Sequence, residues 1–468
     1  MKFGLLSRYV ICLKQIHRIA GICGISLLVS GCMVGPNYVR PTMDVGTQFK
    51  ETPGWKVARP AANEPRGPWW SMYKDPVLSD LIVELNASNQ NIALAEARFR
   101  QAVAVTQGAR APLLPSISAT ANTTRSGGGV SSGTSAAITG YGLNAQASWQ
   151  LDIWGSIRRN IEATDATELA LAADVSGARL TAQTAMTLAY LQVRVLDEQR
   201  RLLAATVTTY ERALKLTQNR YNAGISGQGD VAVASTQLAS TRAQLLDLEQ
   251  QRAVFENAVA VLLGRPPSTF AIKAEKVPLI PSAVPVGLPS ELLERRPDIA
   301  AAERRTAAAN AQIGVATAAW FPSLTLTASG GFRGNDLTQW FSAPGQIWAL
   351  GPQLAALIFD GGARQAQINQ ARAQFDAQAA TYRQTVLTAL QEVENAMVQM
   401  RVFEQEEIVQ KQAVQFAQQS LRLARNQYDQ GLIDYLSVAV LETTALNTER
   451  TYITLVGNRF AARVRLVA

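Results

Sequence analysis

The chain has 468 residues, of which 47% are hydrophobic, and a formal net charge of +8. Its three cysteines and its single histidine all lie within the first 32 residues. A chain cleaved before Cys32 therefore has no disulfide, no zinc site made of histidine and cysteine, and no histidine-activated nucleophile. No cluster of lysine and arginine occurs after this segment, which argues against nucleic-acid binding. We expect no cofactor, no metal site and no catalysis.

The N-terminal segment, residues 1–31, has the pattern of a secretory signal. It carries four basic residues and then the uncharged run IAGICGISLLVSG, which is too short to span a bilayer as a helix. The sequence VSGC at its end resembles the bacterial lipobox, in which cleavage makes the cysteine the new N-terminus and lipid is attached to it. An ordinary cleavage site with a cysteine nearby is the alternative. We predict that Cys32 is lipidated and that residues 32–75 form a lipid-anchored extended segment.

Two segments that follow alternate with a period of two residues. LNAQASWQLDI, from Leu143, places apolar and polar side chains on opposite faces. PSISATANTTR, from Pro115, is its expected partner across a loop rich in glycine and serine. Each run has about the 9–11 residues that a tilted membrane-spanning strand needs. The pattern predicts a β-hairpin.

Long helices come next in the chain. Residues 155–221 contain a single internal glycine and no proline, which favours one continuous helix. Side chains spaced by four and three residues continue into the next segment: Leu203, Val207, Tyr210, Leu214, Thr217, Tyr221, Leu238, Thr241, Leu245, Leu248, Arg252, Phe255, Val259 and Leu262. This heptad seam predicts paired helices. The glycine-rich run YNAGISGQGD between them predicts a turn and an antiparallel hairpin.

A proline-dense run separates the two halves of the chain. Residues 266–289 are unsuited to a helix and are predicted to be a connector. The run RRPD, from Arg295, then predicts a helix start, since proline suits the first turn and an acid there stabilises the helix dipole.

The second half repeats the order of the first. PSLTLTASGGF, from Pro322, and IWALGPQLAALIF, from Ile347, predict two further strands. Residues 363–430 contain neither proline nor glycine, and a helix of that length is about 100 Å long. A second turn is predicted at YDQGLIDY, from Tyr428.

The two halves match at an offset of 207 residues. The matched pairs are Ile92 and Ile299, Glu96 and Glu303, Pro115 and Pro322, Tyr221 and Tyr428, and Gly224 and Gly431. They fall at equivalent points of one helix–hairpin–helix–turn–helix order. We therefore predict a tandem duplication, with repeats at residues 76–265 and 290–468.

The number of strands determines how the chain can cross a membrane. Lipid tolerates only helices and closed barrels, and the smallest barrels have about eight strands. Two chains with four strands each form a barrel of about eight strands, which has no lumen. Three chains form a barrel of about twelve strands, which has an open lumen. The sequence thus predicts an α+β membrane protein in which three chains share one twelve-stranded β-barrel. A long α-helical coiled-coil barrel is predicted to continue it.

Several motifs in fixed order carry a family resemblance: GCMVGPNYVRP, PWWSMYKDPVLSDLI, LPSELLERRPDIAAAE, NAQIGVATAAWFPSLTLTASGGF and YLSVAVLETTALNTERT. The chain resembles outer-membrane efflux lipoproteins of the TolC superfamily, in the NodT-type branch that serves resistance-nodulation-division pumps. The resemblance covers essentially the whole mature chain. It implies a homotrimer in the outer membrane with a long periplasmic part, which passively conducts small molecules or ions. Its implied partners are a periplasmic adaptor and an inner-membrane pump.

The resemblance also assigns residues to the periplasmic tip, where two helical turns form the aperture of such channels. Tyr221 and Gly224 match the first Tyr-x-x-Gly turn, and Tyr428 and Gly431 match the second. The glycines are expected to adopt a positive φ. The tyrosines either link neighbouring helices or only fill the seam.

Family members usually carry an aspartate just beyond the second turn, where symmetry makes a ring of carboxylates. The run GLIDYLSVAVLETT departs from the usual LDAQ pattern, so the ring is assigned to Asp429, Asp434 or Glu442. Carboxylates around one axis attract cations. The alternative is that these are solvated acids at helix ends.

Two other functions share parts of this pattern. A type I duct for polypeptide secretion has the same architecture, but the lipobox and the RRPDI motif favour efflux of small molecules. A lipid-anchored coiled-coil protein without a pore has no need of strictly alternating strands.

Overall fold

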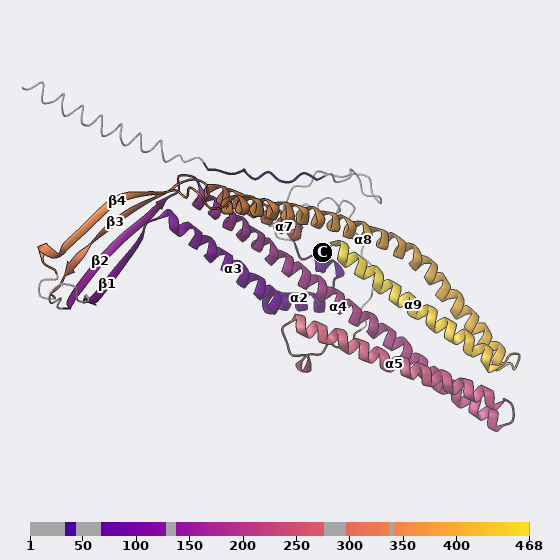
Figure 1. Cartoon of the computed structure of the whole chain (residues 1–468). Coiled ribbons are helices and arrows are strands. Elements are labelled where there is room, and N and C mark those ends of the chain that lie inside the picture. The colour runs from indigo at the N-terminus through magenta and orange to yellow at the C-terminus, as the bar shows by residue number, and fades with distance from the viewer. Residues whose placement is uncertain (1–32, 44–66, 128–136, 276–295, 337–340, 468) are drawn as a thin grey trace, which may run out of the picture. The chain divides into compact units, whose positions relative to one another are not determined.

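The computed structural model describes residues 33–43, 67–127, 137–275, 296–336 and 341–467. Its helices are α2 (Pro76–Ser88), α3 (Gln90–Arg110), α4 (Ser156–Asn222), α5 (Gln228–Leu262), α7 (Pro297–Ala318), α8 (Ala363–Asp429) and α9 (Tyr435–Val467) (Figure 1). Its strands are β1 (Ser116–Ser126), β2 (Ile138–Leu151), β3 (Ser323–Gly334) and β4 (Gln346–Ala355). The signal segment and most of the connector lie outside the described residues.

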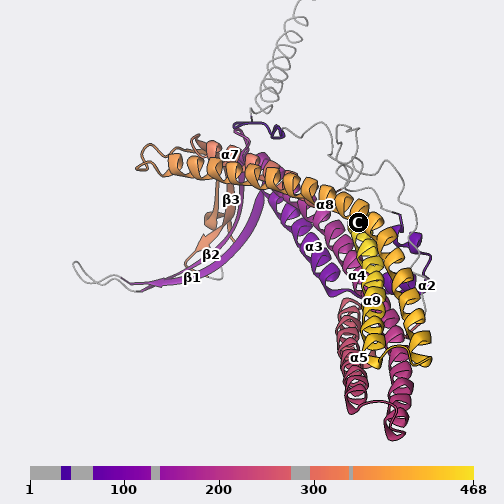
Figure 2. The ribbon, with the colours of Figure 1, turned by 90° about the vertical axis from the view of Figure 1, so that its right-hand side faces the viewer.

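The two long helices are confirmed. α4 and α8 have 67 residues each and end at the predicted turns, after which α5 and α9 run back beside them (Figures 1 and 2). The RRPD motif does start a helix, since α7 begins at Pro297 with Asp298 in its first turn. No helix in the described part of the chain combines the length and the hydropathy that a transmembrane helix needs.

The four predicted strands form one antiparallel sheet in the order β1-β2-β3-β4. β1 pairs with β2 from Ser116↔Ser148 onward, and β3 pairs with β4 from Ser323↔Ala355 onward, so both predicted hairpins are confirmed. The hairpins are joined by β2 and β3, for example at Trp149↔Leu326. One sheet therefore contains strands from both halves of the chain.

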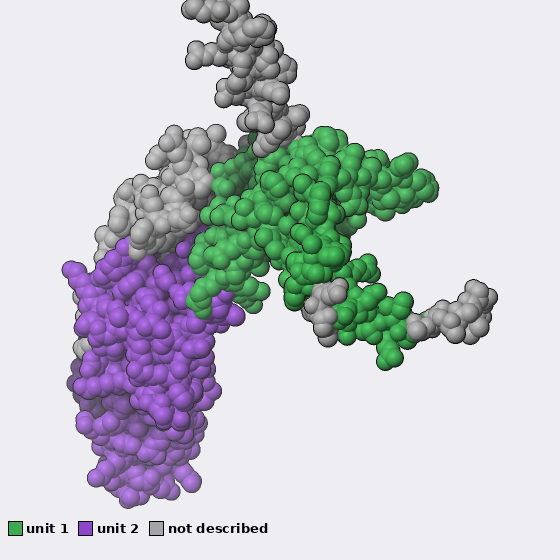
Figure 3. Space-filling view, turned by 90° about the vertical axis from the view of Figure 1, so that its left-hand side faces the viewer, with its two compact units in different colours: residues 1–43, 98–172, 301–383 green, residues 44–97, 173–300, 384–468 purple. Residues whose placement is uncertain are grey.

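The chain divides into two compact units, shown separately coloured in Figure 3. The first consists of residues up to 43, 98–172 and 301–383, and it contains the sheet. The second consists of residues 44–97, 173–300 and 384–468, and it contains both helical turns. Each unit thus draws on both of the predicted repeats.

The core of the second unit forms where α2 packs on α4. Leu78, Ile82 and Leu85 are fully buried against Met186 and Tyr190. Their spacing on α2 is four and three residues, which puts all three on one helix face. Just before α2, the aromatic run Trp69–Tyr73 packs on the same core and on a neighbouring cluster. These aromatic residues therefore pack the helices together.

Candidate functional site

The sheet has one apolar and one polar face, as its register shows. The apolar face carries Ile117, Leu143, Ala145, Ala147, Trp149, Leu324, Leu326, Phe332, Trp348, Leu350 and Leu354. The polar face carries Ser118, Thr120, Asn144, Gln146, Ser148, Thr325, Thr327, Ser329 and Gln353. Apolar side chains such as Leu350, which is 76% exposed, are not covered by any described residue of the chain. One face therefore suits lipid and the other suits water.

The two outer edges of the sheet are open. In the described part of the chain, β1 pairs only with β2, and β4 pairs only with β3. The backbone groups along these edges need partners in a bilayer, because lipid offers no hydrogen bonds. A further strand on each side is therefore required for the sheet to enter a membrane.

Aromatic and aliphatic side chains gather where the strands meet the helices. Trp154 stacks on Phe321 with ring centroids 4.6 Å apart, and its indole Nε1 donates to the carbonyl of Pro322 at 2.8 Å. Leu357, Ile358 and Phe359 follow β4 and are all strongly exposed. Rings with a polar atom satisfied beside an apolar surface are typical of a membrane–water interface.

The two helical turns of the second unit have the same backbone geometry. Gly224 has φ +73° and Gly431 has φ +75°, so the predicted positive φ is confirmed at both. The N–H of Gly224 donates a hydrogen bond to the carbonyl of Tyr221, and that of Gly431 donates to the carbonyl of Tyr428, both at 2.9 Å. A second bond closes each turn, from Ile225 N to Arg220 O at 2.8 Å and from Leu432 N to Gln427 O at 2.9 Å. These are helix ends of the Schellman type.

The two tyrosines of these turns differ in burial. Tyr221 is 40% exposed, whereas Tyr428 is buried and meets Tyr435 edge-on, with ring centroids 5.7 Å apart. The guanidinium of Arg220, from α4, lies 4.6 Å from the centre of the Tyr428 ring. Tyr428 thus both fills the seam and contacts the other helical hairpin.

The three candidate acids lie in different surroundings. Asp429 is the exposed last residue of α8. Asp434 precedes α9 and accepts hydrogen bonds from the backbone N–H (3.0 Å) and the hydroxyl (2.6 Å) of Ser437, which lower its pKa. Glu442 is only 4% exposed and forms an ion pair with Arg425 at 2.7 Å. Asp429 and Asp434 are thus open to solvent, and Glu442 is held inside the chain.

Glu442 belongs to a buried polar cluster that sequence patterns did not predict. We call Tyr210, Gln237, Arg425, Tyr435 and Glu442 the Glu442 cluster. The Gln237 amide donates to Glu442 at 3.4 Å, and the Tyr435 hydroxyl donates to Gln237 at 3.3 Å. Burial and the nearby Glu442 carboxylate raise the pKa of Tyr210 to about 12. The cluster connects the two helical hairpins near their turns.

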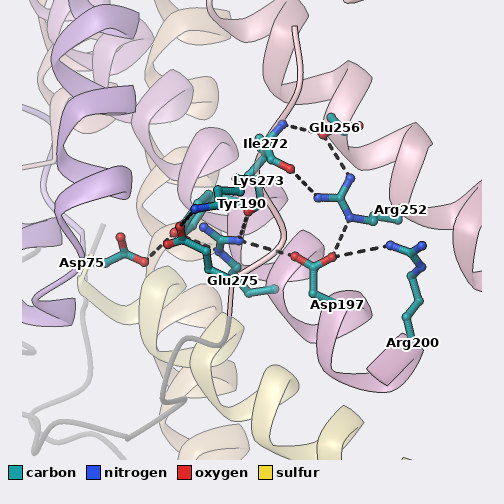
Figure 4. A network of polar contacts seen from close by, with 10 residues as sticks. Asp75, Tyr190, Asp197, Arg200, Arg252, Glu256, Ile272, Lys273 and Glu275 are labelled. Atoms are coloured by element: carbon teal, nitrogen blue, oxygen red, sulfur yellow. Dashed lines mark hydrogen bonds and ion pairs between the residues drawn. The ribbon is translucent and has the colours of Figure 1, made fainter. Parts of the chain in front are cut away.

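A second polar cluster, the Asp197 network, fixes the beginning of the connector (Figure 4). The side chain of Asp197 is 7% exposed and pairs with Arg252 at 2.6 Å and with Arg194 at 3.4 Å. Both guanidiniums also donate hydrogen bonds to backbone carbonyls: Arg252 to that of Ile272 and Arg194 to that of Lys273, each at 2.7 Å. The network therefore ties a segment without regular structure to α4 and α5.

Two glycines at the first turn give a prediction, because alanine is expected to have opposite effects on stability at Gly224 and at Gly229. A Cβ on Gly224 meets no atom within 4 Å, so alanine there adds only the strain of a positive φ, about 1–2 kcal/mol. Gly229 also faces open space but lies in the first turn of α5, where alanine stabilises by up to about 1 kcal/mol. We expect Gly224→Ala to lower the midpoint of thermal unfolding and Gly229→Ala to raise it, as measured by helical circular dichroism. A drop of equal size in both variants would contradict this reading of the turn.

The predicted lipidation site, Cys32, lies outside the described residues, which begin at Met33. The described residues contain no group of three histidine, cysteine, aspartate or glutamate side chains that could hold a metal ion.

Comparison with known proteins agrees with this geometry. The model of the family "Outer membrane efflux protein" matches residues 81–265 and 288–468. Nodulation protein T of Rhizobium leguminosarum bv. trifolii is 31% identical over 421 residues, covering 88% of each chain. The pyoverdine export outer membrane protein OpmQ of Pseudomonas aeruginosa is 34% identical over 398 residues, covering 82% of this chain and 81% of OpmQ.

The fold is shared with a solved channel. The structure of the outer-membrane channel OprN superposes with a TM-score of 0.85 at 28% identity, covering 93% of this chain and 98% of OprN. The two-faced sheet, the paired long helices and a family match over most of the sequence lead to one assignment. The chain belongs to the outer membrane efflux protein family.

Proposed function

We propose that three copies of the chain form one channel through the outer membrane and that the channel carries out efflux without catalysis. The observation that carries this proposal is the sheet with one apolar face, one polar face and two open edges. Pairing of β1 with β4 of the next copy closes twelve strands into a barrel. The apolar face then meets lipid, and the hydroxyls and amides of the polar face line a water-filled lumen.

The two turns form the periplasmic aperture in this proposal, with Tyr221, Gly224, Tyr428 and Gly431 at the tip. The nearly equal φ angles of Gly224 and Gly431, 207 residues apart, support a tandem duplication, and so do the two family matches, which begin at residues 81 and 288. We assign the carboxylate ring to Asp429 and Asp434, because the carboxylate of Glu442 is occupied by Arg425. The open acids then attract cations at the entrance.

The partners in this proposal are a periplasmic adaptor and an inner-membrane pump of the resistance-nodulation-division class. Relatives that are named as outer membrane proteins of efflux pumps support this assignment, among them TtgC of Pseudomonas putida. Relatives named for toluene and for pyoverdine support small molecules as cargo, in preference to polypeptides.

The channel is tested by reconstitution of the mature protein into planar bilayers. We expect discrete conductance steps from a species that has three times the mass of one chain in detergent. A protein that stays monomeric and passes no current is instead a lipid-anchored coiled-coil protein without a pore.

The lipid anchor gives a separate prediction. Cys32→Ser removes the predicted acceptor, so metabolic labelling with palmitate is expected in the unchanged protein and lost in the variant. Cys32 is the only cysteine left after cleavage before it, so no other thiol can substitute. Label that persists in the variant would place the lipid elsewhere.

A further inference from the structure

The residues directly after Cys32 are bound to the folded chain from the first described position. A Cβ on Gly155, which has φ +79°, would lie 2.5 Å from Cγ of Met33, so the Met33 side chain rests directly on that glycine. The backbone N–H of Val34 donates to the carbonyl of Trp154 at 3.1 Å. Met33, the residue directly after the cysteine, is therefore itself packed on the body of the protein.

Arg159 of α4 holds the next residues of this segment. Its side chain is 1% exposed, and its Nε donates to the carbonyl of Val34 at 3.1 Å. Its Nη2 donates to the carbonyl of Gly35 at 3.2 Å and to the side-chain oxygen of Asn37 at 2.9 Å. Nη1 pairs with Glu162 at 2.7 Å, which balances the buried charge. A fixed fork of donors suits arginine and cannot be reproduced by lysine.

The fit between this segment and α7 depends on two glycines. Gly35 has φ +91°, and a Cβ on it would lie 2.5 Å from Cα of Gly314. A Cβ on Gly314 would in turn lie 2.8 Å from Cδ of Arg159. Beside them, the Asn310 amide donates to the carbonyl of Pro36 at 3.0 Å. Such a close backbone approach is possible only without side chains at both positions.

We propose that this arrangement, the N-terminal dock, fixes the lipid-bearing end of the chain at the junction of strands and helices, and that Arg159 is its positioning residue. The inference rests on the proposed lipidation of Cys32. Trp154, which binds Val34, lies three residues after the end of β2 and stacks on Phe321 in the aromatic group of the junction. A rigidly attached lipid holds that junction at the membrane surface, so it helps to seat the strands. A loosely tethered lipid would only keep the chain nearby.

The test combines Gly35→Ala with Cys32→Ser in the full chain. For Cys32→Ser, a signal cleaved without lipidation replaces residues 1–31. The matched control for Gly35→Ala is Gly362→Ala, because Gly362 has φ +93° and faces open space, so it carries the same backbone strain without the clash. Arg159→Lys disrupts the dock from its other side. For each variant, the fraction of chain inserted in outer membranes is measured as trimer that resists protease, with palmitate labelling in parallel.

We expect Gly35→Ala and Arg159→Lys to lower the inserted fraction several-fold when Cys32 is lipidated, to the level of Cys32→Ser alone. In the Cys32→Ser background the same changes are expected to have no further effect on the inserted fraction. Gly362→Ala is expected to leave the inserted fraction unchanged both with and without lipidated Cys32. Equal losses in both backgrounds would show a general folding role and overturn the inference. So would full insertion of Gly35→Ala or of Cys32→Ser. Absence of palmitate from the unchanged protein would refute the lipid anchor itself, which is a distinct failure.

Discussion

Replacing Asp197 by alanine is expected to lower the free energy of unfolding by about 3–5 kcal/mol. Asp197 is the shared acceptor of Arg194 and Arg252, whose side chains are almost entirely inside the protein. Removal of its carboxylate takes the acidic partner from Arg194 and leaves Arg252 with Glu256, at 3.0 Å. An unpaired buried charge costs far more than a pair contributes. The Asp197 carboxylate also orients the two arginines that donate to the carbonyls of Ile272 and Lys273, so this segment is held less firmly without it.

The matched control is Glu249→Ala in the same part of the second unit. Glu249 pairs with Arg200 at 3.1 Å, but both side chains reach solvent, so the expected loss is about 0–1 kcal/mol. Urea unfolding of the detergent-solubilised protein, followed by helical circular dichroism, measures both variants. The network is not a structural tie if Asp197→Ala unfolds at the same urea concentration as Glu249→Ala.

The elements that the sequence predicted well are those with a local cause. The absence of proline and glycine from residues 363–430 indicated α8, which ends one residue earlier, at Asp429. The strict alternation around Trp149 predicted β2 and the apolar face on which that residue lies. The turn glycines were found because a positive φ leaves a recognisable residue type at a fixed spacing.

The contacts that hold these elements together left no comparable pattern in the sequence. Arg159 reaches carbonyls about 125 residues earlier in the chain, and a backbone acceptor leaves no mark on residue type. Arg252 was recognised as a polar member of the helical seam, but its partner Asp197 lies 55 residues away on another helix. Glu442 was singled out as an aperture acid, yet the proximity of Arg425, 17 residues earlier, depends on how α8 and α9 pack. Such partners emerge only from tertiary packing.

Leu350→Arg is expected to abolish insertion of the channel, whereas Ala349→Arg is expected to leave it intact. The two residues are neighbours on β4, so they lie at almost the same depth on opposite faces. Leu350 pairs with Ala328 on the apolar face, and Ala349 pairs with Ser329 on the polar face. An arginine that faces lipid near the bilayer midplane costs about 2–4 kcal/mol, and the proposed trimer would carry that cost three times.

In the proposed trimer, an arginine at position 349 enters the lumen, where water solvates it, so its effect is expected in conduction. Three positive charges around one axis are expected to lower single-channel conductance for cations and to shift the reversal potential toward anion selectivity in a salt gradient. The fraction of protease-resistant trimer in outer membranes measures insertion for both variants. The assigned orientation of the sheet is wrong if Leu350→Arg inserts and changes selectivity while Ala349→Arg fails to insert. Loss of insertion in both variants would instead mean that the lumen at this depth is too narrow or too dry for a charge.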